Sequence, residues 1–549
     1  MTLLGNMMVE PLLIPRLLEH GARHAGASEV VSRRTEGDVH RYTWRDCLVR
    51  SKRLAQALNA RGVQPGDRIA TLAWNGYRHL ELYYAVSGIA AVCHTINPRL
   101  FVDQIAYIIN NAGDRYVFFD TSFQALVEQL VVQCPNVQGW IVLCDEDALA
   151  SHQKTPTATH DRWESYEAWL APHDGQFRWP ELDEEQAAFL CYTSGTTGNP
   201  KGVLYSHRSL VLMAFACALP DSFNCAARDV IAPVVPMFHV NAWALPFVAP
   251  MVGAKLVLPG PKLDGASLHA LFDAEGVTLS AGVPTVWLGY MDHLDSEGVK
   301  TAAMQRAVVG GSACPARLAQ RLKAAGVDVV HAWGMTELSP VGTVFAPSRG
   351  FASKSQEEQA RLSLKQGRAL PGIDLKIVST DGQELPWDGE SAGTLMARGN
   401  WVVERYYGDT ETALVDGWLP TGDVATIDEE GYIQITDRSK DVIKSGGEWI
   451  SSIDLENIAL QHADVRLAAC IAAKHAKWDE RPLLVVVTHE GRTPTAADIL
   501  AIYEGKVPKW WIPDDVVFTD TLPLTATGKL QKRALRDQYG EHTWTHTPK

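Results

Sequence analysis

Apolar residues in the first part of the chain alternate between a helical and a strand-like spacing. Leu48, Leu54 and Leu58 recur at helical intervals from residue 43 to about residue 61, and Gly62 marks the end of that helix. Further runs predict a helix over residues 76–88 and strands over residues 68–73, 90–94, 116–120 and 139–144. Such alternation is typical of a mostly parallel sheet covered by helices.

The alternation resumes after the polar, proline-bearing stretch 145–180, which we expect at the surface. Strands are predicted at 255–258, 277–281, 306–310 and 327–332, with helices at 264–274 and 315–325. Residues 350–366 are charged and predict a loop. From about residue 370, short strands separated by Asp-Gly and Glu-Gly turns predict a small β-barrel or meander.

A domain boundary is expected at residue 438, after which the chain has an α+β pattern of its own. Helices are predicted there at 452–462 and 495–506, with strands at 467–472, 483–488 and 515–518. We therefore predict an α/β fold. Residues 1–437 would form a large N-terminal domain of mostly parallel sheets plus the small β-barrel, and residues 438–549 a small mobile α+β domain.

Composition narrows the class of protein. A chain of 549 residues exceeds one ordinary core, and its net charge of −14 argues against nucleic acid as the main partner. Nine cysteines without a C-x-x-C pair predict buried thiols in a reducing compartment. Residues 1–10 lack the features of a secretory signal, and prolines interrupt the longest apolar region, 230–252. We therefore expect a cytoplasmic protein without an integral membrane segment.

A hydroxyl- and glycine-rich loop follows the apolar run 187–191 and has the chemistry of a polyphosphate site. Glycines let backbone N–H groups approach a ligand, hydroxyls donate to phosphate oxygens, and a lysine adds positive charge. The residues concerned are Thr193, Ser194, Gly195, Thr196, Thr197, Gly198 and Lys201. A polar hairpin turn is the structural alternative. Lys201 precedes the last glycine and a β-prone run follows, so the loop joins two strands and is not a Walker A motif.

Further motifs stand in a fixed order behind this loop: 310–315, 331–337, 421–423, 443–451 and 522–530. Taken singly, they could be strand–helix turns, a helix N-cap, turn residues or a glycine hairpin. Together with the loop, they resemble the adenylate-forming superfamily of acyl-CoA synthetases, luciferases and adenylation domains, over residues 40–535. The runs 94–100 and 445–451 are most similar to bacterial medium-chain fatty acid–CoA ligases and 3-methylmercaptopropionate–CoA ligases.

The resemblance implies an ATP site in the N-terminal domain. The loop residues would bind the β- and γ-phosphates, Gly311, Ser312 and Ala313 would line the adenine, and Trp333 and Gly334 would lie along it. Thr336 would contact a phosphate, and Glu337 would bind Mg²⁺, which prefers hard oxygen ligands. Asp423 would accept the ribose hydroxyls, with help from Arg438.

The resemblance also implies two half-reactions, with the C-terminal domain turning about Lys440 between them. Lys529 would neutralise charge as the acyl carboxylate attacks the α-phosphate. After rotation, the loop 445–449 would line the tunnel for coenzyme A; its residues are Ser445, Gly446, Gly447, Glu448 and Trp449.

The acyl site is expected around His239 and Trp243, with Val283 and Pro284 beside them. His239 could be a core histidine, but the resemblance favours a gate between the acyl group and the CoA channel. No Arg or Lys stands in these stretches, so an unbranched apolar acid is favoured, and the bulky Trp243 suggests a medium or short chain.

The sequence therefore predicts an ATP- and Mg²⁺-dependent acid–thiol ligase that forms an acyl-CoA through an acyl-AMP. A 3-methylmercaptopropionate–CoA ligase is the alternative, because a thioether acid is about the size of a short fatty acid. An acyl-AMP transferase to a carrier protein is less favoured, and a non-catalytic nucleotide-binding protein is disfavoured because Lys201, Glu337, Asp423 and Lys529 are all present. A homodimer is a family expectation.

Overall fold

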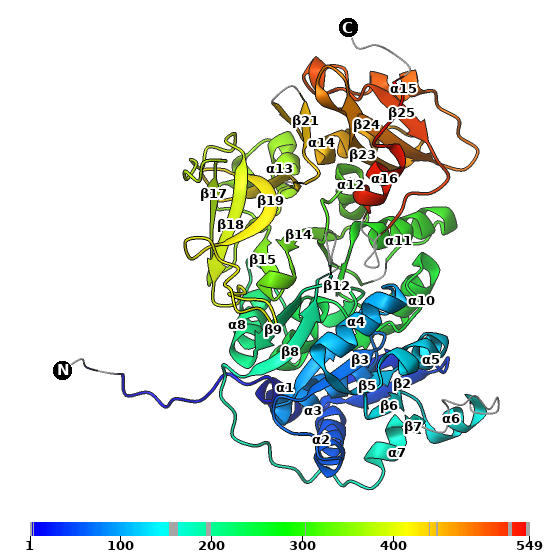
Figure 1. Cartoon of the computed structure of the whole chain (residues 1–549), viewed down its shortest axis with the longest axis vertical. Coiled ribbons are helices and arrows are strands. Elements are labelled where there is room, and N and C mark those ends of the chain that lie inside the picture. Colours follow the sequence, from blue (N-terminus) through cyan, green and yellow to red (C-terminus); the bar gives the residue numbers. More distant parts are fainter. Residues whose placement is uncertain are drawn as a thin grey trace.

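The computed structural model describes residue 3 and residues 5–152, 163–193, 199–301, 303–438, 440–445, 448–524 and 530–544 (Figure 1). Two large sheets, a small antiparallel sheet and a C-terminal sheet are built from this part of the chain. Within the same residues, no helix is both long and apolar enough to cross a membrane.

The first large sheet is parallel except at β9, which pairs antiparallel with β8. In spatial order its strands are β7 (Trp163–Ser165), β6 (Gly139–Val142), β5 (Asp114–Phe119), β3 (Arg68–Leu72), β4 (Val92–Thr95), β8 (Ala187–Tyr192) and β9 (Gly202–Ser206).

The second large sheet is parallel from β14 to β1 and antiparallel at both edges. In spatial order its strands are β16 (Arg368–Ala369), β15 (Val341–Val344), β14 (Asp328–Gly334), β13 (Arg306–Val309), β12 (Leu279–Gly282), β10 (Val230–Pro233), β11 (Lys255–Leu258), β1 (Glu29–Arg33) and β2 (Val39–Thr43).

One shared layer of helices lies between the two large sheets, and its apolar residues join strands of both in one core. These helices are α1 (Ile14–His24), α2 (Trp44–Ala60), α3 (Tyr77–Gly88), α8 (His207–Ala218) and α9 (Leu245–Val252). A reciprocal capping box between Thr43 and Asp46 starts α2, at the helix start that the sequence predicts.

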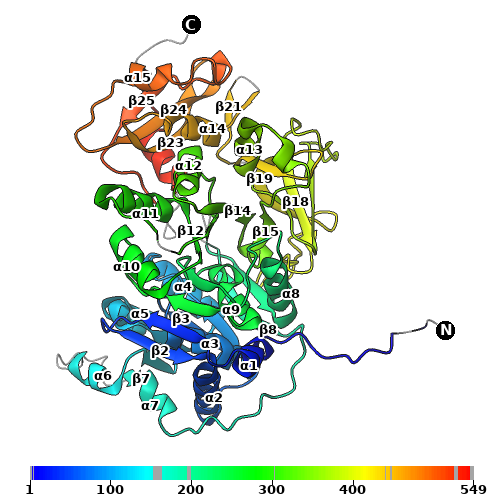
Figure 2. The ribbon, with the colours of Figure 1, turned by 180° about the vertical axis from the view of Figure 1, so that it is seen from behind.

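Outer helices cover the far face of each sheet with a core of their own. On the first sheet these are α4 (Val102–Ala112) and α5 (Gln124–Gln133); on the second they are α10 (Gly265–Glu275), α11 (Pro284–Glu297) and α12 (Ala316–Ala324). The view from behind shows α10, α11 and α12 along one side of the second sheet (Figure 2).

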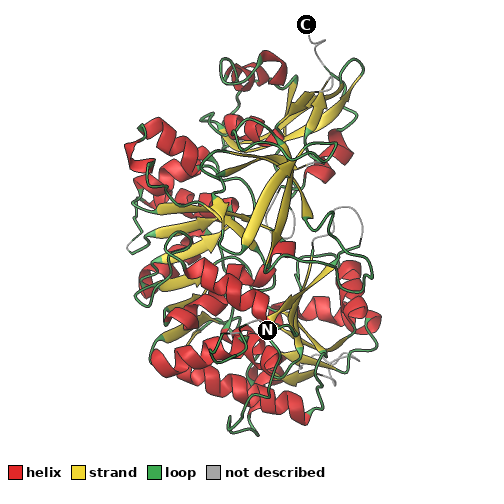
Figure 3. Cartoon of the chain, turned by 90° about the vertical axis from the view of Figure 1, so that its left-hand side faces the viewer, coloured by secondary structure: helices red, strands yellow, loops and turns green. Residues whose placement is uncertain are grey.

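Two smaller units complete the chain. The antiparallel meander consists of β17 (Ile373–Val378), β18 (Gly393–Gly399), β19 (Leu419–Ile427) and β20 (Ile433–Arg438). The C-terminal unit, at the top of Figure 3, consists of β21 (Ile443–Ser445), β22 (Glu448–Ile450), α14 (Ser452–Ala459), β23 (Val465–His475), β24 (Asp479–Thr488), α15 (Ala496–Ala501), β25 (Asp515–Phe518) and α16 (Lys532–Tyr539).

The predicted alternation of helices and strands is confirmed, but two stretches contain more structure than the sequence indicated. Residues 350–366 were expected to be a loop, yet they include α13 (Gln356–Ser363), which starts with a Ser355–Glu358 capping box. The stretch 145–180 contains α6 (Glu146–His152), β7 and α7 (Tyr166–Leu170), and the side chains of Tyr166 and Trp169 are buried. The nine cysteines are buried free thiols, as predicted.

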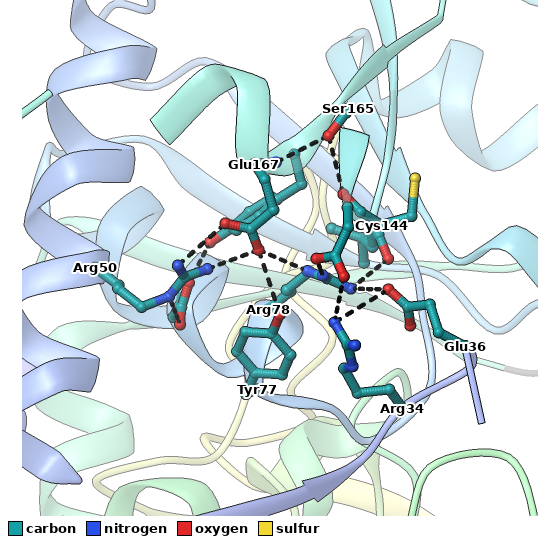
Figure 4. Close-up of polar contacts among 12 residues, drawn as sticks. Arg34, Glu36, Arg50, Tyr77, Arg78, Cys144, Ser165 and Glu167 are labelled. Carbon is teal, nitrogen blue, oxygen red and sulfur yellow. Dashed lines mark hydrogen bonds and ion pairs between the residues drawn. The ribbon is translucent and has the colours of Figure 1, made fainter. Parts of the chain in front are cut away.

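A partly buried ionic network, centred on the buried Arg78, ties the turn of the β1–β2 hairpin to the first sheet (Figure 4). Arg78, in the first turn of α3, has a side chain that is 4% exposed and pairs with Glu36, Asp145 and Glu167 at 2.7, 2.5 and 2.9 Å. It also donates to the Leu143 carbonyl at 2.9 Å. Burial alone would raise the pKa of Glu167, but Arg50 and Arg78 more than offset this, so that its pKa is lowered. The network therefore depends on ionised carboxylates.

Burial of His207 predicts a loss of stability in acid. Its Nδ1 accepts a hydrogen bond from the Ile14 N–H at 3.3 Å, and burial lowers its pKa from 6.5 to about 4. Below pH 6.5 the unfolded chain therefore binds a proton that the folded chain excludes, and the free energy of unfolding falls until about pH 4. We expect His207→Gln to flatten the decline of the midpoint of thermal unfolding between pH 7 and pH 4.5.

The exposed His20→Gln serves as the control and should leave this decline unchanged. An equal slope in the wild type and His207→Gln would show that His207 does not carry the effect.

Candidate active site

Most of the predicted site residues of the N-terminal region follow the carboxyl ends of parallel strands, one in the first large sheet and four neighbours in the second. In open α/β sheets, ligands bind beyond these ends. Thr193 follows β8, His239 and Trp243 lie in the connection after β10, and Val283 and Pro284 follow β12. Gly311, Ser312 and Ala313 follow β13, and Thr336 and Glu337 follow β14. The two large sheets thus bring together motifs that are far apart in the sequence.

The hydroxyl-rich loop joins two antiparallel strands, as predicted. At its base, the Thr193 N–H donates to the Lys201 carbonyl at 2.9 Å, and the Lys201 N–H donates to Thr193 Oγ1 at 3.2 Å. The other predicted phosphate-binding residues, Ser194, Gly195, Thr196, Thr197 and Gly198, lie outside the described residues. The structure therefore defines the two ends of this loop, Thr193 and Lys201.

Glu337 is connected to Lys201 through an aromatic residue that the sequence did not single out. Tyr406 donates its hydroxyl to Glu337 Oε1 at 2.9 Å, and the Lys201 Nζ lies 4.6 Å from the centroid of the Tyr406 ring. Glu337 is 8% exposed, and burial raises the pKa of its carboxyl, although a hydrogen bond from its own backbone N–H, then Tyr406 and Arg438, counteract this rise. The carboxyl group of Glu337 and the ammonium group of Lys201 thus both contact Tyr406, and both are available for a polar ligand.

The backbone around Thr336 is held by a second tyrosine. The hydroxyl of Tyr205, on β9, donates to the Thr336 carbonyl at 2.6 Å, and the Val403 N–H donates to the Glu337 carbonyl at 2.8 Å. The predicted phosphate loop and the Thr336–Glu337 pair therefore both adjoin β9.

Trp333 and Asp423 contact each other directly. Trp333 Nε1 donates to Asp423 Oδ2 at 2.8 Å, while Arg438 Nε lies 3.7 Å from Asp423 Oδ1. Asp423 on β19 and Arg438 on β20 are opposite each other in the meander. The indole thus orients the carboxylate that was predicted to accept the ribose hydroxyls.

The indole of Trp243 contacts the strand end that precedes the predicted adenine loop. A Cβ placed on Gly310 would lie 3.0 Å from the Trp243 ring and 2.9 Å from the Ala332 carbonyl, so only glycine allows this approach. Trp243 belongs to the turn Val240–Ala244, whose residues all have φ between +40° and +66°. Left-handed backbone in non-glycine residues costs roughly 1–2 kcal/mol per residue, so the surrounding structure must hold this turn in place.

The C-terminal motifs are described only in part. Ser445, on β21, is buried and accepts a hydrogen bond from Arg481 Nη1 at 3.1 Å. Glu448 and Trp449 begin β22 and pair with β21, and Lys440 lies between β20 and β21. Gly446, Gly447 and Lys529 lie outside the described residues. Their assigned roles stay predictions, as do those of the other site residues.

Comparison with known proteins identifies the family. A family profile described as AMP-binding enzyme matches residues 17–407, and one described as AMP-binding enzyme C-terminal domain matches residues 454–529. The chain belongs to the AMP-binding enzyme family. Both matches agree with the N-terminal position of the clustered site residues and with the separate C-terminal unit.

This AMP-binding enzyme has relatives of nearly equal length. It is 50% identical over 541 residues to a protein named medium-chain-fatty-acid–CoA ligase from Ectopseudomonas oleovorans, covering 98% of each chain. It is 51% identical over 541 residues to one named 3-methylmercaptopropionyl-CoA ligase from Ruegeria lacuscaerulensis, covering 98% of this chain and 99% of the relative. The structure of ATP-bound MatB from Rhodopseudomonas palustris matches with a TM-score of 0.79 and 25% identity, covering 96% of this chain and 99% of MatB.

The Trp333–Asp423 contact predicts an effect on ATP that is separable from stability. Trp333→Phe keeps an aromatic ring but removes the donor that orients Asp423, so we expect the KM for ATP to rise about tenfold. Initial-rate kinetics at saturating acid and CoA would measure it.

Trp44→Phe is the matched control, because the Trp44 indole also donates from a buried position, to the Ala254 carbonyl at 2.9 Å. It should lower the temperature of unfolding without changing the KM for ATP. The same KM in Trp333→Phe and the wild type would contradict the assigned role of the contact.

Proposed function

We propose that this enzyme is an ATP-dependent acid–thiol ligase that converts a medium-chain or short fatty acid into its acyl-CoA. The reaction would pass through an acyl-AMP and release AMP and pyrophosphate. The observation that carries the proposal is the chain of contacts from Lys201 through Tyr406 to Glu337. It joins a positive charge at the phosphate loop to a buried carboxylate, as binding of a polyphosphate with its cation requires.

Mg²⁺ fits this arrangement as an ion that arrives with ATP. Among the described residues, no group of three His, Cys, Asp or Glu side chains could hold a metal by itself. Mg²⁺ is commonly bound through one or two carboxylates together with substrate phosphates, and Glu337 offers one buried carboxylate. Bound there, the ion would neutralise phosphate charge.

Different residues around ATP would bind its phosphates, bind its ribose and promote the attack on its α-phosphate. The loop from Thr193 to Lys201 would hold the β- and γ-phosphates, Thr336 a phosphate, and Asp423 with Arg438 the ribose. Lys529 would neutralise the charge that develops when the acyl carboxylate attacks the α-phosphate. Opposite unit charges about 4 Å apart attract by about 4 kcal/mol at an effective dielectric near 20, which corresponds to roughly a thousandfold in rate.

Residues 438–549 would then turn about Lys440, and this rotation would replace one set of their residues in the active site with another. Lys529 would leave the site, and the loop from Ser445 to Trp449 would line the path of coenzyme A. His239 would separate the acyl group from that path. One site could thereby run adenylate formation and thioester formation in succession.

The acid is proposed from the lining of its site. Trp243, Val283 and Pro284 are apolar, and residues 236–243 contain no lysine or arginine that could pair with a second carboxylate. An unbranched apolar acid fits, and the relative named medium-chain-fatty-acid–CoA ligase supports this choice. The relative named 3-methylmercaptopropionyl-CoA ligase, at 51% identity, supports a short thioether acid as the second candidate.

A rate series over straight-chain acids from three to twelve carbons, with 3-methylmercaptopropionate included, tests the proposal. We expect pyrophosphate release that depends on the acid and a CoA thioester once CoA is added, with the highest kcat/KM for a medium-chain acid. Highest activity with 3-methylmercaptopropionate would select the second candidate. Pyrophosphate release without a thioester would indicate an acyl-AMP transferase, and the absence of pyrophosphate release with every acid would refute a ligase.

The Tyr406 hydroxyl predicts a pH effect of known sign. Its hydrogen bond lowers the pKa of Glu337 against the rise caused by burial, so Tyr406→Phe should raise that pKa further. Glu337 then stays protonated up to a higher pH than in the wild type. We expect the acidic limb of the pH profile of kcat/KM for ATP·Mg²⁺ to move to higher pH, with activity recovered above that limb.

Tyr432→Phe is the control, because its buried hydroxyl donates to the Ala346 carbonyl at 2.8 Å. Its pH profile should match that of the wild type. An unshifted acidic limb in Tyr406→Phe would mean that Glu337 does not control this part of the profile.

A further inference from the structure

The turn between β3 and α3 is fixed by hydrogen bonds on every side. The Trp74 N–H donates to Asp120 Oδ2 at 2.7 Å, and the buried His79 donates from Nδ1 to the Trp74 carbonyl at 3.1 Å. The Gly260 N–H donates to the Asn75 carbonyl at 3.0 Å. Just beyond the turn, Arg78 is locked into the partly buried ionic network (Figure 4). The position of Asn75 is therefore set by both large sheets.

The side chain of Asn75 holds three backbone groups at the end of β10 and in the segment that follows it. It is 3% exposed; its Nδ2 donates to the carbonyls of Pro233 and Val235 at 2.8 and 2.9 Å, and its Oδ1 accepts from the Met237 N–H at 2.7 Å. Both amide protons and the amide oxygen are thus used. Among side chains that match this size, only an amide offers two donors and an acceptor in such an arrangement.

This held segment leads directly into the acyl-site residues. His239 comes two residues after Met237, and the left-handed turn Val240–Ala244 begins immediately afterwards. Tyr83, on α3, donates its hydroxyl to the Met237 carbonyl. On the far side of the turn, Tyr84 donates to the Pro246 carbonyl at 2.7 Å. A turn with unfavourable φ angles is thereby held at both ends by groups on or next to α3.

We propose that Asn75 is a positioning residue for the acid substrate: it fixes the backbone of residues 233–237 so that His239 and Trp243 keep their places in the acyl site. This inference rests on the proposed function. Asn75 does not touch the acid in this account and acts through the segment it binds. Without it, the segment loses three hydrogen bonds, and the strained turn can relax away from the acyl chain.

The effect should fall mainly on the acid, because the predicted phosphate- and ribose-binding groups lie on or next to other strands. Thr193 and Lys201 lie at β8 and β9, Glu337 lies between β14 and β15, and Asp423 lies on β19. None of the hydrogen bonds of the Asn75 side chain reaches these strands. A purely structural loss would change the apparent affinities for both substrates alike.

Asn75→Ala and Tyr83→Phe test the inference in the full-length enzyme. We expect Asn75→Ala to lower kcat/KM for the preferred acid about ten- to a hundredfold, with the KM for ATP changed less than about twofold. The values of kcat/KM for acids of different length should also become more similar, because the wall of the acyl pocket is no longer fixed. Tyr83→Phe, which removes one hydrogen bond to the same segment, should act in the same direction with a smaller effect.

Gln366→Ala and Tyr503→Phe are the matched controls. Gln366 is a buried amide that accepts from the Ile435 N–H at 2.7 Å, and Tyr503 is a buried tyrosine that donates to the Leu455 carbonyl at 2.7 Å. Both substitutions should lower the temperature of unfolding and leave kcat/KM for each acid, relative to the others, unchanged. An acid-selective loss in the two test variants, absent from the controls, supports the inference.

Equal changes in the kinetics of acid and ATP, or an acid profile like that of the wild type, would overturn the inference. If Asn75→Ala fails to fold, Tyr83→Phe decides by the same criteria. The proposed function fails in a distinguishable way. A wild-type enzyme that releases no pyrophosphate with any acid refutes that function and this inference with it, whereas an active wild type with unselective variants refutes this inference alone.

Discussion

The shared layer of helices between the two large sheets is the constraint on which the rest of the structure depends. Arg78, at the start of α3 in that layer, pairs with carboxylates from the β1–β2 turn, from the segment after β6 and from α7. Removing one partner of a fully buried ion pair costs about 3–5 kcal/mol, and the cost is lower where solvent screens the charge, as at Asp145, whose side chain is 45% exposed. The ionic cluster around Arg78 therefore fixes how the hairpin of one sheet meets the other sheet. It is this fixed relation that lets strand ends from both sheets contribute to one site.

Two features of the site, a buried carboxyl group and a left-handed turn, are energetically unfavourable by themselves. Hydrogen bonds from neighbouring residues stabilise both. Burial raises the pKa of Glu337, and Tyr406 supplies a donor that favours the ionised form. The turn Val240–Ala244 has left-handed backbone without a glycine, and the groups on and around α3 hold both of its ends. Strain and desolvation of this kind persist only where the surroundings are rigid. The ionic cluster around Arg78 provides that rigidity a few residues from Asn75.

Much of the fold could be predicted because each element carries its signal locally. The capping box of α2 and the apolar runs of the parallel strands lie within a few residues, and the lysine-before-glycine order of the phosphate loop already indicated two strands. The features that the sequence did not predict are contacts between residues far apart in the chain. Tyr406 lies 69 positions from Glu337, and Asn75 lies 162 from Met237. No spacing rule connects such pairs before the topology is known. Left-handed backbone at Asn241, Ala242 and Trp243 was equally unreadable, because these side chains do not require positive φ.

The same reasoning explains why a sequence specifies the nucleotide chemistry more plainly than the acid. Phosphates, ribose hydroxyls and Mg²⁺ demand charged or polar groups of defined type, so their sites leave motifs. An apolar acid is recognised by shape, and one methylene in a hydrophobic pocket is worth only about 1–3 kcal/mol. Such a difference can arise from small displacements of a pocket wall, without any change in the residues that line it. Relatives at 50 and 51% identity carry names for different acids, which is what a pocket shaped by its supports would allow. Under the inference about Asn75, the groups that hold the segment around Trp243 would contribute to the choice of acid.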